Sequence, residues 1–299
     1  MTGPAATPAS GLVVVDKPGG MTSHDVVARI RRLAGTRKVG HAGTLDPMAT
    51  GVLVVGVEKA TRLLGYLTLT EKEYQATIRL GQSTSTDDAE GELISSAPAA
   101  DVCAEALDKA VAELTGDIQQ VPPTVSAIKV GGQRAYRLTR AGAAPELKPR
   151  PVTVHEFTIT GVRRERGGAL LDVDATVRCS SGTYIRSLAR DLGAALGTGG
   201  HLTQLRRSRV GGYGLDVART LDQLAGHFEV LPLAQAASAA FPRRDLTESE
   251  ARRLTNGGRL AAVAGGQAPG PTAAFAPDGT LIALIAEESG QARPLAVFA

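Results

Sequence analysis

The sequence is poor in aromatic side chains and cysteine, and it has no long apolar run. It contains no tryptophan, five tyrosines and five phenylalanines, so few rings are available to stack on a planar ligand. Cys103 and Cys179 lie far apart and belong to no Cys-x-x-Cys or Cys/His cluster, which argues against a disulfide framework or a structural zinc site. No stretch approaches the roughly 18–20 apolar residues of a membrane-spanning helix. We therefore expect a cytoplasmic protein that does not enter the membrane.

The first ten residues, MTGPAATPAS, contain no basic side chain and no long apolar run. A secretory signal peptide needs both, so we expect a short flexible tail instead. At 299 residues the chain is long for one domain, which favours one large domain and one small one. Its 35 glycines follow no repeat period and indicate many tight turns rather than disorder.

The charges are unevenly distributed along the chain, although the formal net charge is only +3. Segments 11–40, 129–150 and 178–210 hold more than half of the 33 lysines and arginines but few of the 30 acidic residues. If these three segments share one face, that face would suit the phosphates of a nucleic acid. If they point in unrelated directions, they are ordinary solvated surfaces. The charge pattern alone leaves both interpretations open.

The spacing of apolar residues predicts a mixed α/β chain. Strands are expected at 11–15, 51–57, 74–81, 151–160 and 169–178, and helices at 22–35, 58–67, 104–115 and within 180–197. Between 125 and 142 the sequence predicts a strand, a Gly-Gly turn and a basic helix that ends near Gly142. Because strands outnumber helices and often follow one another directly, we expect a largely antiparallel sheet.

The pattern changes from about residue 243. A short helix in TESEARRLTNGG is followed by short strands that are separated by PDGT and ESGQ turns. Fewer than 60 residues in small strands suggest a compact barrel that leans on the main domain. We therefore expect a tail at 1–10, a main domain at 11–242 and a small C-terminal domain at 243–299.

A single acidic residue stands in the stretch GHAGTLDPMATGVLVV, residues 40–55. Asp46 follows a glycine-rich approach and precedes Pro47, just before an apolar run that predicts a buried strand. Asp-Pro is common in surface turns, and a turn is one interpretation. The other interpretation is that the loop holds Asp46 at the edge of a sheet as a nucleophile.

A second candidate acid lies in ALLDVDATV, residues 169–177, which matches the DxDxT signature of phosphotransferases that use an aspartyl nucleophile. However, Asp172, Asp174 and Thr176 alternate with apolar residues, as in an ordinary half-exposed strand. The signature also normally opens its domain, whereas here it falls past the midpoint. The pattern therefore favours a strand over a phosphotransferase site.

Five successive segments resemble the motifs of the TruB family, the bacterial tRNA pseudouridine synthases. In family order they are DKPGGMTSHDVV, KVGHAGTLDPMATGVL, KEYQATIRLG, CSSGTYIRSLARDLG and GGHLTQLRRSRVG, and they fall within residues 11–215. The resemblance implies an enzyme that isomerises uridine 55 in the T-arm of tRNA without a metal or organic cofactor. It also implies the mixed α/β (α+β-like) pseudouridine synthase fold, with a largely antiparallel central sheet and a small C-terminal PUA-like β-barrel domain.

The resemblance assigns catalytic roles to three residues. Asp46 corresponds to the nucleophile, which would attack either C1′ of the ribose or C6 of the base once the base is flipped out of the stack. Arg186 corresponds to an arginine that holds this carboxylate ionised and oriented. Tyr74 corresponds to a tyrosine that stacks on the flipped base and could take the C5 proton, although its place on the apolar face of a strand favours a plain core residue. Glu73 replaces a threonine that the family often has.

Further residues match positions that contact RNA in the family. His41 corresponds to a residue that moves into the gap left by flipped nucleotides; the alternative is a loop histidine bonded to backbone. Leu205 corresponds to an apolar residue packed against the target base, or it belongs to the core. Lys17 would support the active-site loop or contact RNA. The remaining RNA-binding candidates are Lys129, Tyr136, Arg206, Arg207 and Arg209.

Three functions are compatible with these motifs. The first is a stand-alone tRNA pseudouridine synthase, and the second is a tRNA-folding chaperone or RNA-binding protein in which catalysis is secondary. The third is a guide-RNA-dependent relative that needs protein partners, and the bacterial-type motifs and small C-terminal segment argue against it. We expect a monomer that binds the T-arm of tRNA and has no obligatory protein partner.

Overall fold

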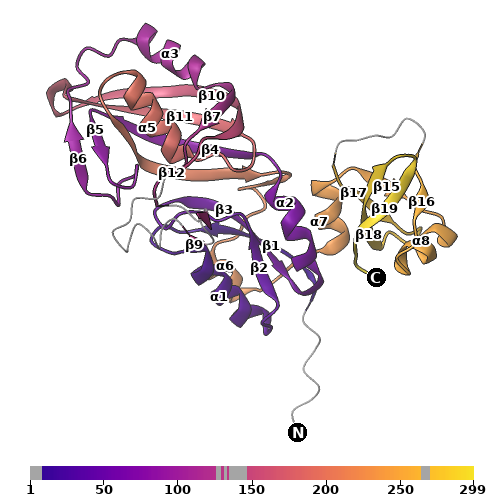
Figure 1. Cartoon of the computed structure of the whole chain (residues 1–299). Coiled ribbons are helices and arrows are strands. Elements are labelled where there is room, and N and C mark those ends of the chain that lie inside the picture. Colours follow the sequence, from indigo (N-terminus) through magenta and orange to yellow (C-terminus); the bar gives the residue numbers. More distant parts are fainter. Residues whose placement is uncertain (1–8, 126–128, 131–132, 135–146, 264–269) are drawn as a thin grey trace. The chain divides into compact units, whose positions relative to one another are not determined.

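The computed structural model describes residues 9–125, 129–130, 133–134, 147–263 and 270–299 (Figure 1). The chain forms two compact units. The first comprises Met1–Pro47, Gly51–Thr70 and Val210–Ala299, and the second comprises Met48–Thr50 and Glu71–Arg209. The predicted domain boundary at residue 243 falls inside the first unit and stays a prediction.

The first unit is built on a small antiparallel sheet. Its central strand β1 (Gly11–Lys17) pairs with β3 (Thr50–Val57) along its whole length, from Gly11 opposite Val57 to Lys17 opposite Gly51. Strand β2 (Val39–Ala42) pairs with β3, and the short β14 (Leu231–Pro232) pairs with the other edge of β1. Both faces of this sheet are covered, which explains why its two long strands read as uninterrupted apolar runs.

One face of the small sheet packs on two helices, α1 (Ser23–Ala34) and α6 (Leu221–Gly226) (Figure 1). Helix α1 begins with a capping box between Thr22 and Asp25, and Gly35 ends it in the left-handed conformation at φ +63°. Val26, Val27 and Ile30 are buried. These features confirm the helix that the sequence predicts at 22–35.

The opposite face packs on the helices η1 (Glu58–Leu63), α2 (Leu64–Thr68) and α7 (Leu233–Ala240), and α7 in turn contacts the C-terminal sheet. The C-terminal sheet has the order β15 (Arg243–Asp245), β17 (Thr272–Phe275), β18 (Leu281–Glu288), β19 (Gln291–Val297), β16 (Leu260–Ala261), with helix α8 (Glu248–Thr255) beside it. Only β15 and β17 pair in parallel. This half-barrel is consistent with the predicted PUA-like domain.

The second unit contains the larger sheet. Its strand order is β12 (Gly200–Val210), β4 (Lys72–Leu80), β11 (Leu170–Cys179), β10 (Arg150–Glu165), β7 (Gly116–Gln120). Strand β11 runs antiparallel to β4 and β10, and β10 runs antiparallel to β7. Helix α5 (Ile185–Ala195) packs on β4, and α3 (Ala104–Glu113) contacts both α5 and β10 (Figure 1). The prediction of a mixed α/β fold with a largely antiparallel sheet is confirmed.

Smaller elements complete the described chain. Strands β5 (Gln82–Thr84) and β6 (Leu93–Ser96) form one hairpin. The predicted strand before the Gly-Gly turn is present as β8 (Lys129–Val130), but it pairs antiparallel with a second strand, β9 (Gln133–Arg134), where the sequence predicts the start of a basic helix. A 3-10 turn, η2 (Arg166–Gly168), precedes β11, and β13 (Tyr213–Gly214) follows β12. The Gly-Gly turn and the remainder of the basic helix predicted to end near Gly142 lie outside the described residues.

The apolar and polar faces of β4 and β11 alternate as their sequences predict, but Thr77 and Asp172 on the polar face are buried rather than half-exposed. Tyr74, Ala76 and Ile78 are buried on β4. On the other face of β11, Asp172 accepts two bonds from the Arg79 guanidinium at 2.7 Å each. Asp174 accepts a bond from Thr77 Oγ1 at 2.7 Å and pairs with Arg163. The DxDxT segment is therefore an ordinary strand whose aspartates form cross-strand pairs.

Two predicted boundaries are wrong. The strand predicted at 151–160 continues to Glu165, because Gly161 sits in a β-bulge (the register against β11 shifts between Ile159 and Gly161) and does not end the strand. The single helix predicted at 58–67 is a 3-10 turn over Glu58–Leu63 followed by the short α-helix Leu64–Thr68.

Candidate active site

Asp46 lies between β2 and β3, and the backbone on both sides of it is held by hydrogen bonds. Before it, the Leu45 N–H donates to Ser23 Oγ (2.9 Å), and this hydroxyl donates to the Leu45 carbonyl (3.0 Å). After it, the Pro47 carbonyl accepts a bond from the Gly20 N–H (2.8 Å). Asp46 itself is half-buried. The loop therefore fixes the backbone next to the carboxylate and leaves the carboxylate partly accessible, as a nucleophile requires.

Lys17 holds the same loop through hydrogen bonds to its backbone. Its side chain is 0 % exposed, and its ammonium donates to the carbonyl oxygens of Pro18 (2.8 Å), Met21 (2.7 Å) and Pro47 (3.2 Å). A buried charge is costly unless hydrogen bonds compensate it, so these contacts tie the end of β1 to the Asp46 loop. Of the two roles predicted for Lys17, this geometry supports the loop contact rather than an exposed RNA contact.

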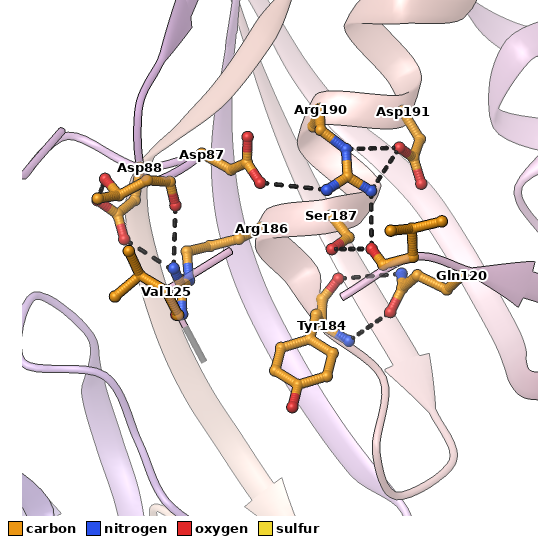
Figure 2. Close-up of polar contacts among 11 residues, drawn as sticks. Asp87, Asp88, Gln120, Val125, Tyr184, Arg186, Ser187, Arg190 and Asp191 are labelled. Atoms are coloured by element: carbon orange, nitrogen blue, oxygen red, sulfur yellow. Dashed lines mark hydrogen bonds and ion pairs between the residues drawn. The ribbon is translucent and has the colours of Figure 1, made fainter. Parts of the chain in front are cut away.

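Arg186 is the second residue of α5 and is only 5 % exposed. Its Nη1 donates to the Thr86 carbonyl (2.9 Å), its Nη2 donates to the Val125 carbonyl (3.0 Å), and its Nε lies 3.6 Å from Asp88 Oδ2 (Figure 2). The alternative of a solvated surface arginine is therefore wrong. Arg186 joins two loops of the second unit.

Sequence reasoning missed Asp88. This buried carboxylate also shapes its own loop, because Oδ1 accepts bonds from Thr86 Oγ1 (2.5 Å) and the Glu90 N–H (3.0 Å). The segment STSTDDAEG contains two adjacent acids among hydroxyl residues, which is typical of a turn. No spacing rule connects that turn to an arginine so distant in the sequence.

Tyr74 and Lys72 lie on the same face of β4, and both are buried. Lys72 stands opposite Cys179 of β11. Burial, helped by the charge of Arg207, lowers the pKa of Lys72 to about 8, and burial raises the pKa of the Cys179 thiol to about 11. The position of Tyr74 is compatible with a core tyrosine, and its stacking role stays a prediction.

The candidates on β12 differ in accessibility. Arg207 is 1 % exposed, which argues against a surface phosphate contact. Arg206 is half-buried and donates to Thr50 Oγ1 (3.3 Å). Arg209 is half-buried and pairs with Glu73 at 3.4 Å. The departure from the family at Glu73 thus provides an ion pair between β4 and β12.

Leu205 is buried on β12 and lines a hollow of about 660 Å³ in the second unit. Gln75, Thr77 and Arg206 also line this hollow. Both predicted roles for Leu205, a core residue and a contact to the target base, are compatible with this position.

His41 is not in a loop, as one interpretation of the sequence assumed. It lies in β2 opposite Val55, is half-buried, and contacts the ring of His24 edge-on, with ring centroids 5.6 Å apart and an interplanar angle of 84°. Lys129 belongs to β8. Tyr136 lies outside the described residues. The RNA-binding roles of His41, Lys129 and Tyr136 stay predictions.

Across the described ranges, no three His, Cys, Asp or Glu side chains gather in a group that could hold a metal ion. No helix in that same part of the chain is long and apolar enough to cross a membrane.

Three protein-family models match the chain in succession. The model for the TruB family pseudouridylate synthase N-terminal domain matches residues 31–185. The model for the tRNA pseudouridylate synthase B C-terminal domain matches residues 186–233, and that for the C terminus of tRNA pseudouridine synthase II matches residues 241–299.

Curated relatives match over nearly the whole chain. A tRNA pseudouridine synthase B of Arthrobacter sp. strain FB24 is 64 % identical over 296 residues, covering 97 % of each chain. The protein of the same name from Thermobifida fusca strain YX is 65 % identical over 293 residues, covering 97 % of this chain and 99 % of the relative.

Solved structures match as well. A Cbf5–Nop10–Gar1 complex contains a chain with a TM-score of 0.74 and 28 % identity, over 97 % of this chain and 85 % of that one. A structure of an H/ACA RNP bound to a substrate RNA containing 2′-deoxyuridine gives a TM-score of 0.72 and 25 % identity over the same shares. With a family model that spans half of its residues and curated relatives above 60 % identity, this chain belongs to the TruB family of bacterial tRNA pseudouridine synthases, isomerases that act on tRNA.

Proposed function

We propose that this chain converts uridine 55 in the T-arm of tRNA into pseudouridine, with Asp46 as the nucleophile. The observation that carries the proposal is the Asp46 loop. Its backbone is fixed at Leu45 and Pro47, while Asp46 is half-buried. An ordinary surface turn does not need a buried lysine such as Lys17 to hold its backbone. A nucleophile does need a fixed backbone, because its direction of attack must be fixed.

The reaction breaks the N1–C1′ bond, turns the base and joins C5 to C1′, and the proton on C5 is lost while N1 gains one. The base must first leave the RNA stack, which costs a few kcal/mol. Asp46 would attack C1′ or C6 and leave again when the new bond forms. In this proposal Tyr74 stacks on the flipped base and Arg186 holds the carboxylate ionised. Asp46 belongs to the first unit, and Tyr74 and Arg186 belong to the second.

A basic surface on the first unit supports the binding of RNA. Segment 26–38 contains no acidic residue. Its exposed cations are Arg29, Arg31, Arg32, Arg37 and Lys38. Arg31 also donates to the Val39 carbonyl (3.1 Å), and Lys38 lies 4.0 Å from Glu58. We propose that Arg29, Arg32 and Arg37 contact tRNA phosphates. Arg29 and Arg32 are neighbours at i, i+3 on α1, and like charges at that spacing repel unless a polyanion neutralises them.

The test uses purified protein and an unmodified tRNA transcript. Pseudouridine should form at position 55 and nowhere else, without added protein, metal or cofactor. A transcript with cytidine at position 55 is the matched control and should yield none. Product at another uridine would contradict the proposed target, and tight binding without any product would favour the tRNA-folding chaperone.

Several finer statements stay predictions from the sequence. They are a monomeric state, the absence of an obligatory protein partner, a cytoplasmic location, and domain boundaries at 11–242 and 243–299. Sedimentation of the purified protein with and without tRNA would test the first two.

A further inference from the structure

Arg190 lies one helical turn after Arg186 on α5 and reaches the same two segments of the chain. Its Nη1 lies 3.3 Å from Asp87 Oδ2, and its Nη2 donates to the Val121 carbonyl (2.8 Å). Arg186 contacts loop 84–88 through Thr86 and Asp88, and contacts segment 121–125 through Val125. Figure 2 shows both guanidinium groups extending from α5 toward these segments. The helix therefore carries two arginine clamps on one pair of loops.

The start of segment 121–125 is also bound to α5 and to Tyr184, the residue before this helix, by hydrogen bonds between uncharged groups. Gln120 Nε2 donates to the Tyr184 carbonyl (3.1 Å), and the Tyr184 N–H donates to Gln120 Oε1 (2.8 Å). Ser187 Oγ donates to the Val121 carbonyl (2.9 Å), which therefore accepts two bonds from α5. These contacts hold one of the two segments. The other segment, loop 84–88, is held by Arg186 and Arg190 and by the Leu202 amide of β12.

Loop 84–88 needs this support because its backbone is strained. Asp87 has φ +59°, a left-handed backbone conformation that residues other than glycine adopt at a cost in free energy. Its carbonyl accepts a bond from the Leu202 N–H of β12 (3.0 Å), and its carboxylate faces Arg190. Asp87 lies between Thr86 and Asp88, and its backbone conformation directs the Thr86 carbonyl and the Asp88 carboxylate toward Arg186. The ion pair with Arg190 therefore holds Asp87 in that conformation.

We propose that Arg190 is a positioning residue for the isomerisation: through Asp87 and Val121 it holds the two segments that orient Arg186. This inference rests on the proposed role of Arg186 in the reaction. Arg190 does not touch the substrate in this account. It acts through the direction in which the Arg186 guanidinium is held.

A purely structural role is the alternative. Arg190 also pairs with its neighbour Asp191 at 2.8 Å, and half-exposed ion pairs often contribute little to stability. The second unit offers a matched control in Arg79. Its side chain is 29 % exposed against 30 % for Arg190, and it pairs with Asp172 at 2.7 Å.

The experiment compares Arg190→Gln with Arg79→Gln. Arg190→Gln should slow single-turnover pseudouridine formation about tenfold and leave the tRNA dissociation constant within about twofold of the parent. Its melting temperature should fall no further than that of Arg79→Gln. Asp87→Asn should give a similar loss of rate, and the double variant should be no slower than either single variant, because both changes remove one clamp.

The pH profile provides a readout that a structural role would not move. Burial raises the pKa of Asp87, and so does Asp191, whereas Arg190 and Arg186 oppose the rise. Among the described residues, Arg190, Arg186 and Asp191 are the charges that shift this pKa, and β12 contributes the uncharged amide of Leu202. On acidification Asp87 therefore loses its charge at a higher pH than an ordinary aspartate. The parent rate should fall there relative to that of Asp87→Asn.

The outcomes separate this inference from the proposed function. If Arg190→Gln keeps the parental rate while Arg186→Lys loses it, the inference is overturned and the role of Arg186 stands. If Arg190→Gln is no slower than Arg79→Gln, or if its loss of rate matches its loss of stability, Arg190 is only structural. If Arg186→Lys itself keeps normal chemistry, the proposed role of Arg186 fails first.

Discussion

At the scale of single residues, Lys17 links the first strand to the loop of the proposed nucleophile. Its ammonium is buried and bonded to three carbonyl oxygens, of which the Pro47 carbonyl directly follows Asp46. The same carbonyl also accepts the Gly20 N–H. Because the charge cannot reach water, these bonds compensate its desolvation, and the loop cannot move without breaking them.

Lys17→Met should lower both stability and activity. The variant removes the buried donor of three hydrogen bonds to backbone carbonyl oxygens, which we expect to reduce the free energy of unfolding by about 1–3 kcal/mol. Urea denaturation measures this loss, and single-turnover rates should fall as well. Lys59→Met is the control, because Lys59 is exposed and donates to one carbonyl, that of Phe298. Equal effects of the two substitutions would contradict the loop-supporting role of Lys17.

Arg186→Lys should fail in the chemical step even though it keeps the charge. A lysine ammonium is a compact point charge that cannot replace the planar fork between Thr86, Val125 and Asp88. We expect single-turnover chemistry to slow at least about a hundredfold if the fork contributes on the order of 3 kcal/mol. Affinity for tRNA, measured at the same salt concentration, should change little. Near-normal chemistry with poor tRNA binding would instead identify Arg186 as a phosphate contact.

At the scale of elements, β11 contains the DxDxT segment, and its contacts are those of an ordinary strand rather than of a phosphotransferase site. Its two aspartates pair with residues of neighbouring strands, Asp172 with Arg79 and Asp174 with Thr77 and Arg163. The pair of Asp174 with Arg163 is partly exposed, and such pairs typically contribute about 0.2–1 kcal/mol to stability. Asp172 is buried, so the loss of its charge beside Arg79 should cost more. The role of these pairs is to hold strands together on the face opposite to Tyr74.

Asp172→Asn and Asp174→Asn should therefore keep most of the activity. Each variant should unfold at a lower denaturant concentration than the parent because one charged partner is lost, and the decrease should be larger for the buried Asp172 than for Asp174. Single-turnover rates with the tRNA transcript test this expectation. A complete loss of activity in either variant, with its fold intact, would reopen the phosphotransferase interpretation.

Elements with a clear period and clear end signals could be predicted from the sequence. Helix α1 begins at a capping box and ends at Gly35, and β4 buries the side that its alternation predicts. Strand β10 could not be predicted to its full length, because a glycine in a β-bulge looks the same in sequence as a glycine that ends a strand.

In the candidate site, too, only part of the arrangement could be predicted from the sequence. The Asp46 loop is contiguous in sequence, so its motif could be recognised as a whole. The pairs of Arg186 with Asp88 and of Arg190 with Asp87 join residues that are far apart in the chain. Their burial and direction depend on how α5 packs in the second unit, which no local pattern encodes.

At the scale of the whole molecule, binding of a polyanion depends on where the cations lie and not on the net charge of +3. The first unit carries the exposed arginines of α1, and in the second unit Arg207 is buried and Arg209 is paired with Glu73. Fewer cations are therefore available to contact phosphates than the sequence alone suggested.

The dissociation constant for tRNA should rise steeply with salt. A log–log slope of a few units is expected, scaled from roughly 0.7 per phosphate for single strands. Removing two cations with the double variant Arg29→Gln and Arg32→Gln should reduce that slope by about 1–2 units. The matched control is the double variant Arg252→Gln and Arg253→Gln, which removes two exposed arginines from α8. A slope that is unchanged by the α1 substitutions would show that this helix does not contact RNA phosphates.

The most direct test of the account is single-turnover pseudouridine formation by Asp46→Asn with saturating enzyme and the unmodified tRNA transcript. The amide is nearly isosteric with the carboxylate but is a poor nucleophile. The variant should therefore bind tRNA within about twofold of the parent, melt at the parental temperature and form no pseudouridine above background. Asp174→Asn, which makes the same chemical change on β11, should stay active. Turnover well above background by Asp46→Asn would contradict Asp46 as the nucleophile.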